Sequence, residues 1–360
     1  MDELVTALDF EPVAYTKVPR EAYNYMATAV DGEFTLRRNR QAFEWVELVP
    51  RAIADVSSVN TSTEVLGLKM DCPIMVAPSA AHGQLHPDGE LATHRGATAA
   101  GTPMIVSINA SFPIDKIAAA AKGPMWWQLY ARDTEDGNRE LIERAQEAGC
   151  QAIVLTVDSH YLSLRPRAMH DRNLAGGGGG PVNTNPRRAR RVAGEPSQMD
   201  NPYGARGQTP YVDWSTVDQL RTITKLPLLL KGILIGEDAK EATNHGVNGV
   251  IVSNHGARYL DYAPSTLEVL PEIVDAVGGK VPVLIDSGFR RGSDVLKALA
   301  LGAKAVCLGR VPRWGLGAYG APGVQRVLEI LQTELRLAMA ISGYASLDAV
   351  SRNGVRTDFP

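Results

Sequence analysis

The sequence has little of what would assign the chain to secretion or to a membrane. Its 360 residues contain three scattered cysteines, Cys72, Cys150 and Cys307, and none of them lies in a paired metal or redox spacing. No apolar run approaches the roughly 18 residues that a membrane span needs. The acidic start, Met1–Leu4, lacks the basic and then apolar pattern of a signal peptide. We therefore expect a cytoplasmic protein with reduced cysteines and no membrane partner.

An excess of charge of one sign is also absent. The chain carries 37 Lys and Arg residues against 40 Asp and Glu residues, so its net charge is −3. Bulk electrostatics therefore give no support for a nucleic-acid partner. The basic run Arg187–Arg191 is more typical of a solvated loop, and a non-catalytic barrel that binds RNA through this run is a rival hypothesis.

Common nucleotide, hydrolase and metal motifs are missing as well. No GxGxxG follows a predicted strand directly, and the GGK at 278–280 is followed by valine rather than by the Ser or Thr of a phosphate loop. The GxSxG motif of many serine hydrolases is absent. His82 and His86 are four residues apart, but Gly83 and Pro87 interrupt the helix that would align them. We predict no metal site.

What the sequence does contain is a regular alternation of short apolar runs with helix-like stretches such as Asn138–Glu147 and Thr266–Val277. The apolar runs are Pro73–Val76, Pro103–Val106, Met125–Leu129, Ala152–Val157, Pro227–Leu230, Val250–Val252, Pro282–Ile285 and Ala305–Leu308. Eight βα units predict an α/β fold of the closed (β/α)8 TIM-barrel type, spanning about residues 70–345 within one domain of residues 1–360. A doubly wound open sheet is the alternative.

Three regions fall outside this alternation. Residues 1 to about 65 are predicted to form a helical lead-in. Between the fourth and fifth runs lies a long segment with five consecutive glycines, Gly176–Gly180, and we expect a flexible loop at about 165–212. Its part from about 174 to 200 would act as a mobile lid on the catalytic face. The stretch Gly323–Ser342 has the spacing of an amphipathic helix that packs on the core.

The stretch SNHGARYLD at 253–261 follows an apolar run and places a histidine and an arginine at its end. The ordinary pKa of histidine lies near neutrality, which suits His255 to accept a proton. The planar guanidinium of Arg258 can bind a carboxylate through two hydrogen bonds. A base beside a carboxylate-binding group indicates chemistry on the carbon next to an acid group, although a lone histidine in a loop is more often structural.

Polar groups follow all eight predicted strands, where a barrel places its chemistry. They are Ser79, Ser107 with Asn109, Gln128 with Tyr130, Thr156 with Asp158, Lys231, Ser253 with His255, Asp286, and Gly309 with Arg310. The last two loops combine glycines with arginines, DSGFRRG at 286–292 and then Gly309-Arg310, as phosphate sites of barrels do, and this favours FMN before NAD. Lys231 would need a negative partner there, either a reduced flavin or a structural ion pair.

Together these motifs resemble the FMN-dependent α-hydroxy acid oxidases and dehydrogenases, a family that includes glycolate oxidase, lactate oxidase and mandelate dehydrogenase. The resemblance runs from about Tyr23 to Ser351. Besides the motifs at 253–261 and 286–292, it rests on TLRRNR at 35–40, APSA at 77–80, HPDGE at 86–90, QLY at 128–130, TVD at 156–158 and LKG at 230–232.

The resemblance implies that FMN is the cofactor and that an L-2-hydroxy acid is oxidised to the 2-oxo acid. It also implies a homotetramer or homo-octamer. Dioxygen is the simplest electron acceptor, giving hydrogen peroxide. Two alternatives are a dehydrogenase of the same family with another acceptor and a tailoring oxidase that acts on another carboxylic acid.

Each matching residue receives a role from the resemblance. The catalytic set would be His255, Asp158, Tyr130 and Tyr25, with His255 as the active-site base and Asp158 supporting its protonated form. The substrate-binding set would be Tyr25, Asn109, Tyr130, Arg165 and Arg258, with the two arginines on the carboxylate and the two tyrosines on the carboxylate or hydroxyl. The cofactor-binding set would be Pro78, Ser79, Ala80, Ser107, Gln128, Thr156, Lys231 and Ser253 at the isoalloxazine, and Asp286, Gly288, Arg290, Gly309 and Arg310 at the ribityl chain and phosphate.

Several residues depart from the family pattern. Tyr259 stands where many members have Gln, Ser287 stands where Gly is usual, and Asn109 occupies a substrate-facing position that is tryptophan in glycolate oxidase. His160-Tyr161 and Pro166 are also unusual. These departures leave the flavin chemistry intact and bear on the substrate.

Overall fold

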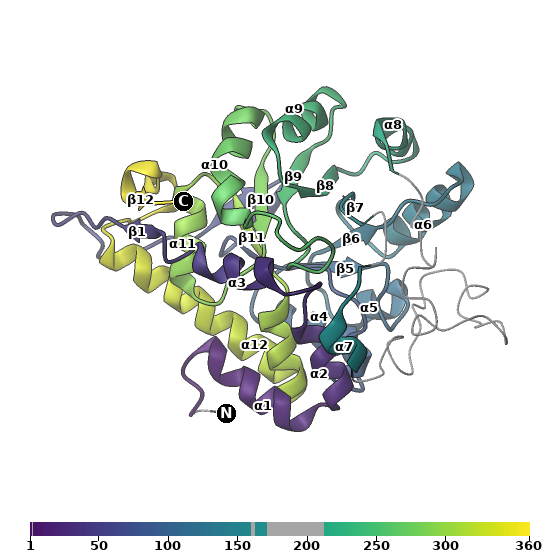
Figure 1. The fold of residues 1–360 in the computed structure, drawn as a ribbon, viewed down its shortest axis with the longest axis horizontal. Helices are drawn as coiled ribbons and strands as arrows, with labels where there is room; N and C mark the ends of the chain where they lie inside the picture. The colour runs from purple at the N-terminus through teal and green to yellow at the C-terminus, as the bar shows by residue number, and fades with distance from the viewer. Residues whose placement is uncertain (2, 160–162, 171–211) are drawn as a thin grey trace.

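The computed structural model of the chain describes residues 1, 3–159, 163–170 and 212–360. Within these residues eight parallel strands close into a barrel (Figure 1). The strands are β4 (Ile74–Val76), β5 (Met104–Ser107), β6 (Met125–Leu129), β7 (Ile153–Thr156), β8 (Leu228–Ile233), β9 (Gly249–Val252), β10 (Val283–Asp286) and β11 (Ala305–Leu308). Each predicted apolar run forms one of them, so the closed barrel is confirmed and the doubly wound alternative is wrong.

Helices follow the strands and cover the outside of the barrel. They are α4 (Gly89–Ala99), α5 (Ile114–Ala120), α6 (Glu135–Glu147), α7 (Pro166–His170), α8 (Trp214–Ile223), α9 (Gly236–Asn244), α10 (Thr266–Val277), α11 (Gly292–Ala300) and α12 (Arg310–Ile341). In α10 the local sequence sets the bounds, because Ser265 and Glu268 cap each other's backbone N–H at the start. Gly278 ends the helix with a φ of 58°.

A hairpin closes the amino-terminal end of the barrel. It consists of β2 (Thr63–Val65) and β3 (Leu68–Met70), which directly precede β4. Val65, Leu68 and Met70 are buried and pack with the side chains that point into the barrel, so the interior is a core rather than a channel. The functional end is therefore the carboxyl ends of the strands.

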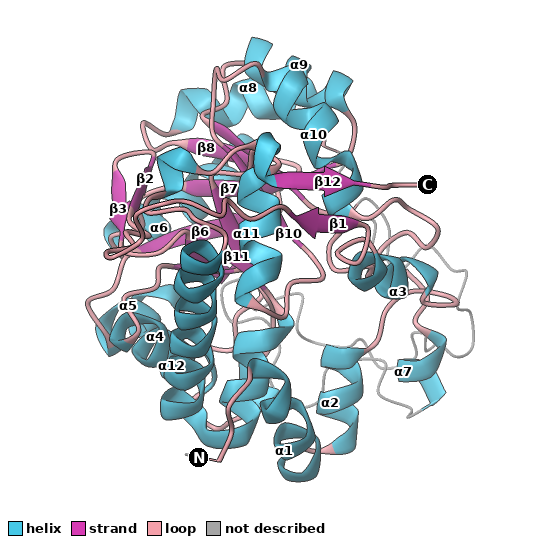
Figure 2. Cartoon of the chain, turned by 90° about the vertical axis from the view of Figure 1, so that its left-hand side faces the viewer, coloured by secondary structure: helices cyan, strands magenta, loops and turns pink. Residues whose placement is uncertain are grey.

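The N-terminal region is only partly helical. It begins with η1 (Ala7–Asp9), α1 (Phe10–Lys17), α2 (Arg20–Ala27) and α3 (Phe34–Gln41), as predicted. A helical lead-in as far as residue 65 is wrong, because β1 (Val46–Leu48) follows and pairs antiparallel with β12 (Val355–Thr357), outside the barrel (Figure 2). Three residues are too few to show alternation, and the partner strand lies near the other end of the chain.

The last helix begins earlier than predicted. Instead of starting at Gly323, α12 starts at Arg310, directly after β11, and its two parts join at a kink where Gly320 has a φ of 64°. It packs against α1 and α4. Short turns of 3-10 helix lie elsewhere, at η2 (His82–Gln84), η4 (Leu347–Ala349) and η5 (Arg352–Gly354). Because α12 begins at Arg310, directly after β11, its first turn lies at the functional end of the barrel.

Most of the loop expected at about 165–212 lies outside the described residues. The lid predicted for 174–200 and the basic run Arg187–Arg191 lie wholly outside them, as do His160-Tyr161. Within the part of the chain that is described, no helix is long and apolar enough to cross a membrane.

Candidate active site

A pocket opens at the carboxyl ends of the barrel strands. The predicted residues that line it are Tyr25, Pro78, Ser79, Ala80, Ser107, Asn109, Gln128, Tyr130, Thr156, Arg165, Lys231, His255, Arg258, Asp286, Gly288, Arg290, Gly309 and Arg310. Asp158 and Ser253 do not line it, but each forms a hydrogen bond with a residue that does. The fold thus brings the predicted set together from segments that are far apart in the sequence.

His255 lies in a left-handed turn just after β9. Its φ is 56° and that of Ala257 is 64°, values that are uncommon for residues with a side chain and are found at functional sites. The backbone N–H of His255 donates to Ser253 Oγ at 3.0 Å. Its Nδ1 lies 2.9 Å from Oδ1 of Asp158, which follows β7. Because Asp158 holds Nδ1, Nε2 is the nitrogen left for a pocket ligand.

Burial and nearby charges set the protonation of this pair. Burial lowers the pKa of His255 below its ordinary value; the Lys231 charge acts in the same direction and Asp158 opposes both. Burial raises the pKa of Asp158, but the charges of His255 and Lys231 outweigh it and hold the pKa below its ordinary value. A neutral imidazole beside a carboxylate results, which is the arrangement of a general base whose protonated form is stabilised.

Gly232 makes the space that Asp158 occupies. Its φ is 114°, and the pairing of β8 with β9 shifts register between Lys231 and Ile233. A Cβ at Gly232 would lie 2.5 Å from Asp158 Cβ, far inside van der Waals contact. The bulge in β8 therefore permits the approach that leads Asp158 to His255.

Lys231 lies at the centre of a buried polar group. It is 3% exposed, its Nζ lies 3.4 Å from Asp286 Oδ2, and it donates to Ser253 Oγ at 2.9 Å. Burial lowers the pKa of Lys231, but the charges of Asp286 and Asp158 outweigh burial and raise it above its ordinary value. Lys231 is therefore a charged residue that both forms the ion pair considered from the sequence and lines the pocket.

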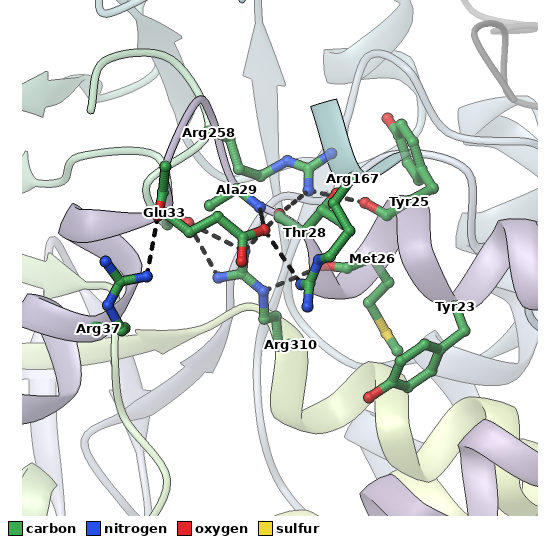
Figure 3. Close-up of polar contacts among 12 residues, drawn as sticks. Tyr23, Tyr25, Met26, Thr28, Ala29, Glu33, Arg37, Arg167, Arg258 and Arg310 are labelled. Carbon is green, nitrogen blue, oxygen red and sulfur yellow. Dashed lines mark hydrogen bonds and ion pairs between the residues drawn. The ribbon is translucent and has the colours of Figure 1, made fainter. Parts of the chain in front are cut away.

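Two arginines of the pocket are oriented by backbone carbonyls of the N-terminal segment (Figure 3). Arg258 Nη1 donates to the carbonyls of Tyr25 at 2.8 Å and Thr28 at 3.0 Å. Arg310 donates to the carbonyls of Thr28 and Gly256, both at 3.1 Å. Within the described chain, the ion pairs to carboxylates involve neither arginine. Their charges therefore remain available to a ligand.

Burial makes these arginines strong candidates for anion binding. Burial and the neighbouring Arg165 lower the pKa of Arg258 to about 10. Burial and Arg40 lower the pKa of Arg290 to about 10, and burial with Arg258 lowers that of Arg310 well below its ordinary value. An anion bound between these guanidinium groups would stabilise their charges in place of the water that burial excludes.

The pocket also contains residues that the sequence did not single out: Met26, Ala77, Gly256, Phe289, Cys307, Leu308 and Arg313. Tyr259 and Ser287, identified as departures from the family pattern, line it too, and the Tyr259 ring packs edge-on to the His255 ring at 4.5 Å. Arg313 was missed because the last helix was expected to begin at Gly323. A helix start at Arg310 would have placed Arg313 in the first turn of a helix that begins at the pocket.

Comparison with known proteins now assigns the family. Residues 14–357 match the sequence model of the FMN-dependent dehydrogenases. The chain belongs to this family. A peroxisomal (S)-2-hydroxyacid oxidase of Arabidopsis thaliana is 40% identical over 99% of this chain and 98% of its own length. Glycolate oxidase 1 of Oryza sativa subsp. indica is 40% identical over 99% and 97%. The crystal structure of a mandelate oxidase is 37% identical, covers 99% of both chains and superposes with a TM-score of 0.89.

As a member of this family, the chain is an FMN-dependent oxidoreductase, and the buried polar atoms of the pocket fit FMN. Gln128 Nε2 and Thr156 Oγ1 are buried without a hydrogen-bond partner in the described chain, and the carbonyl and N–H groups of a flavin ring would satisfy them. Gly288 has a φ of 86°, and a Cβ there would collide with the Asn39 carbonyl. Because Gly288 has no side chain, its backbone N–H can approach a phosphate, which Arg290 and Arg310 can also bind.

We predict that Gly232→Ala lowers turnover by about 100-fold, because a catalytic group displaced by about 1 Å typically costs that much. The added methyl group must push Asp158 away from His255. Gly149→Ala is the matched control, since Gly149 also has a positive φ, of 82°, but has no atom within 4 Å of the added Cβ. Steady-state turnover of both FMN-loaded variants checks the prediction, and equal losses would contradict it.

Proposed function

We propose that the chain oxidises an (S)-2-hydroxy acid to the corresponding 2-oxo acid and passes the electrons to dioxygen, with formation of hydrogen peroxide. The observation that carries the proposal is that His255, paired with Asp158, faces the same pocket as Arg165 and Arg258. A base beside a carboxylate-binding pair suits an acid whose adjacent carbon carries a hydroxyl group. The hydroxy acid oxidases among the relatives support the same assignment.

Arg165 and Arg258, which both lie near the ring of Tyr25, bind the substrate carboxylate. Their Cζ atoms lie 5.9 and 4.9 Å from the centroid of the Tyr25 ring. Burial raises the pKa of Tyr25, but the charges of these arginines outweigh burial and lower it below its ordinary value. Burial raises the pKa of Tyr130 well above its ordinary value, and the neighbouring Tyr259 adds to this, so the Tyr130 hydroxyl stays protonated and can donate a hydrogen bond.

His255 accepts a proton from the substrate through Nε2. Oxidation of the alcohol removes two protons, one from the hydroxyl group and one from Cα, together with two electrons. When bound, FMN supplies the two-electron acceptor. Asp158 stabilises the imidazolium that forms on His255. Loss of the Cα hydrogen as a hydride and its loss as a proton both use this base.

The remaining residues hold the two ligands in place. Asn109, in the loop after β5, would face the substrate, and the charged Lys231 would bind the flavin ring from the base of the pocket. The flavin ring would be lined by Pro78, Ser79, Ala80, Ser107, Gln128 and Thr156, with Ser253 acting through its hydrogen bond with Lys231, and the ribityl phosphate would be held by Asp286, Gly288, Arg290, Gly309 and Arg310. The buried and unpartnered atoms of Gln128 and Thr156 support this assignment.

Assembly and compartment stay predictions for this chain: a homotetramer or homo-octamer, located in the cytoplasm. The name of the Arabidopsis thaliana relative places that protein in the peroxisome.

His255→Ala should abolish reduction of the flavin by 2-hydroxy acids while FMN remains bound. Loss of a general base lowers rates by roughly 10²–10⁴-fold. Anaerobic bleaching of the flavin against a panel of 2-hydroxy acids measures the effect, and the FMN content is read from the mass and absorbance of the released cofactor. His245→Ala is the control, because His245 pairs with Asp218 outside the pocket. Bleaching by the His255 variant at the native rate would exclude His255 as the base.

The pH dependence should report the same base. We expect kcat/KM to rise with pH through a pKa below the ordinary histidine value of about 6.5, because burial favours neutral His255 and only neutral imidazole accepts a proton. Asp158→Asn removes a charge that raises this pKa, so the acid limb should move to lower pH while the maximal rate falls. An acid limb that moves to higher pH in the variant would contradict the proposed pairing.

Electron transfer to dioxygen separates an oxidase from the alternative, a dehydrogenase with another acceptor. We expect anaerobically reduced enzyme to be reoxidised by oxygenated buffer at least as fast as it turns over, with one hydrogen peroxide formed per 2-oxo acid. Stopped-flow absorbance of the flavin and a peroxide assay measure both quantities. If reoxidation is much slower than turnover with a dye or quinone, the chain is a dehydrogenase.

A further inference from the structure

Arg313 is a buried cation in the pocket to which the proposed reaction gives no role. It lies in the first turn of α12, is 6% exposed and lines the pocket. Its Nε and Nη2 atoms are buried and have no hydrogen-bond partner within the described chain. A guanidinium carries five N–H donors and keeps its charge at physiological pH, so burying it without partners is costly. A ligand that supplies acceptors would offset that cost.

The carboxylate of Glu90 acts on Arg313 but does not neutralise it. Its charge influences Arg313, yet the two residues form no ion pair, and Glu90 Oε1 instead accepts a hydrogen bond from the backbone N–H of His82 at 2.9 Å. Glu90 Oε2 has no partner in the described chain. Burial raises the pKa of Glu90 above its ordinary value, and hydrogen bonds from backbone N–H groups oppose this shift. Glu90 thus leaves Nε and Nη2 of Arg313 without a hydrogen-bond acceptor in the described chain.

Arg313 interacts electrostatically with Tyr25, a predicted substrate-binding residue, and with Arg310, a predicted phosphate-binding residue. Its charge acts on Tyr25 together with the charges of Arg258 and Arg165. At the predicted phosphate end, Arg313 acts on Arg310, whereas Arg290 is influenced mainly by Arg40 and by carboxylates. The lowered pKa of Tyr25, in spite of its burial, is consistent with three guanidinium groups around one side chain. A carboxylate has two oxygens, and the guanidinium groups of two arginines are sufficient to bind both of them.

We propose that Arg313 binds a second anionic group of the substrate and that the enzyme prefers 2-hydroxy dicarboxylic acids. This inference rests on the proposed function, in which Arg165 and Arg258 hold the carboxylate next to the hydroxyl-bearing carbon. The second carboxylate, at the end of the side chain, accepts hydrogen bonds from Nε and Nη2 of Arg313. The selectivity between diacids and monoacids of equal length is then set by a residue that is separate from the base.

The test compares acids of equal carbon number in anaerobic flavin reduction and in steady-state turnover. The diacids are (S)-2-hydroxysuccinate and (S)-2-hydroxyglutarate, and the monoacids are (S)-2-hydroxybutyrate and (S)-2-hydroxypentanoate. We expect kcat/KM of the native enzyme to be about 10- to 100-fold higher for a diacid than for its matched monoacid, as hydrogen bonds to charged groups imply. In Arg313→Met this ratio should fall toward one, and Arg313→Lys should retain part of it.

Three controls separate the possible outcomes. Arg336→Met, on the exposed face of the same helix, should keep the native ratio. If Arg313→Met weakens FMN binding and leaves the ratio unchanged, Arg313 serves the cofactor phosphate and the proposal is overturned. If Arg313→Met is unstable, becomes stable again in Arg313→Met/Glu90→Gln and keeps the native ratio there, Arg313 only balances Glu90 and the proposal is also overturned.

The native enzyme alone distinguishes the two levels of inference. Reduction by monoacids without a preference for diacids would overturn the role of Arg313 and leave the proposed function intact. Failure of every 2-hydroxy acid to reduce the flavin would instead overturn the proposed function.

Discussion

The peptide carbonyl of Thr28 accepts hydrogen bonds from two arginines, and the arrangement of the whole pocket depends on this contact. Arg258 Nη1 and Arg310 Nη2 reach it at 3.0 and 3.1 Å, so one carbonyl joins the loop after β9, the start of α12 and the segment after α2. A neutral carbonyl orients a guanidinium without cancelling its charge. This explains how residues before the barrel become part of an active site that is otherwise built from strand ends.

Charge is distributed unevenly over the pocket as a result. Near the barrel axis Lys231 is balanced by Asp286, and His255 is paired with Asp158. At the rim the guanidinium groups contact carbonyls and aromatic rings, as Arg290 does over the Trp314 ring at 4.7 Å. The base can therefore stay neutral while the surrounding rim attracts anions, which is the combination that oxidation of an acid substrate requires.

Much of this site could be predicted from the sequence because a parallel barrel brings all strand ends to one rim. Each short apolar run that was identified as a strand also located the polar residue after it. His255 and Arg258 could be identified as site residues from their position after such a run alone. The strand β1 could not be predicted, because its partner β12 is distant and no periodicity marks three residues. Arg313 escaped because an isolated arginine shows no sign of burial until the helix that carries it is placed.

The buried guanidinium groups also have a thermodynamic consequence for the folded chain. Without anions their mutual repulsion opposes folding, and any ligand that binds only the folded state shifts the equilibrium toward it by mass action. A phosphate or carboxylate at 100 times its dissociation constant adds about 2.7 kcal/mol to the free energy of unfolding. FMN supply would therefore raise the folded fraction of the protein, and the protein without its anions would be the form more exposed to proteolysis.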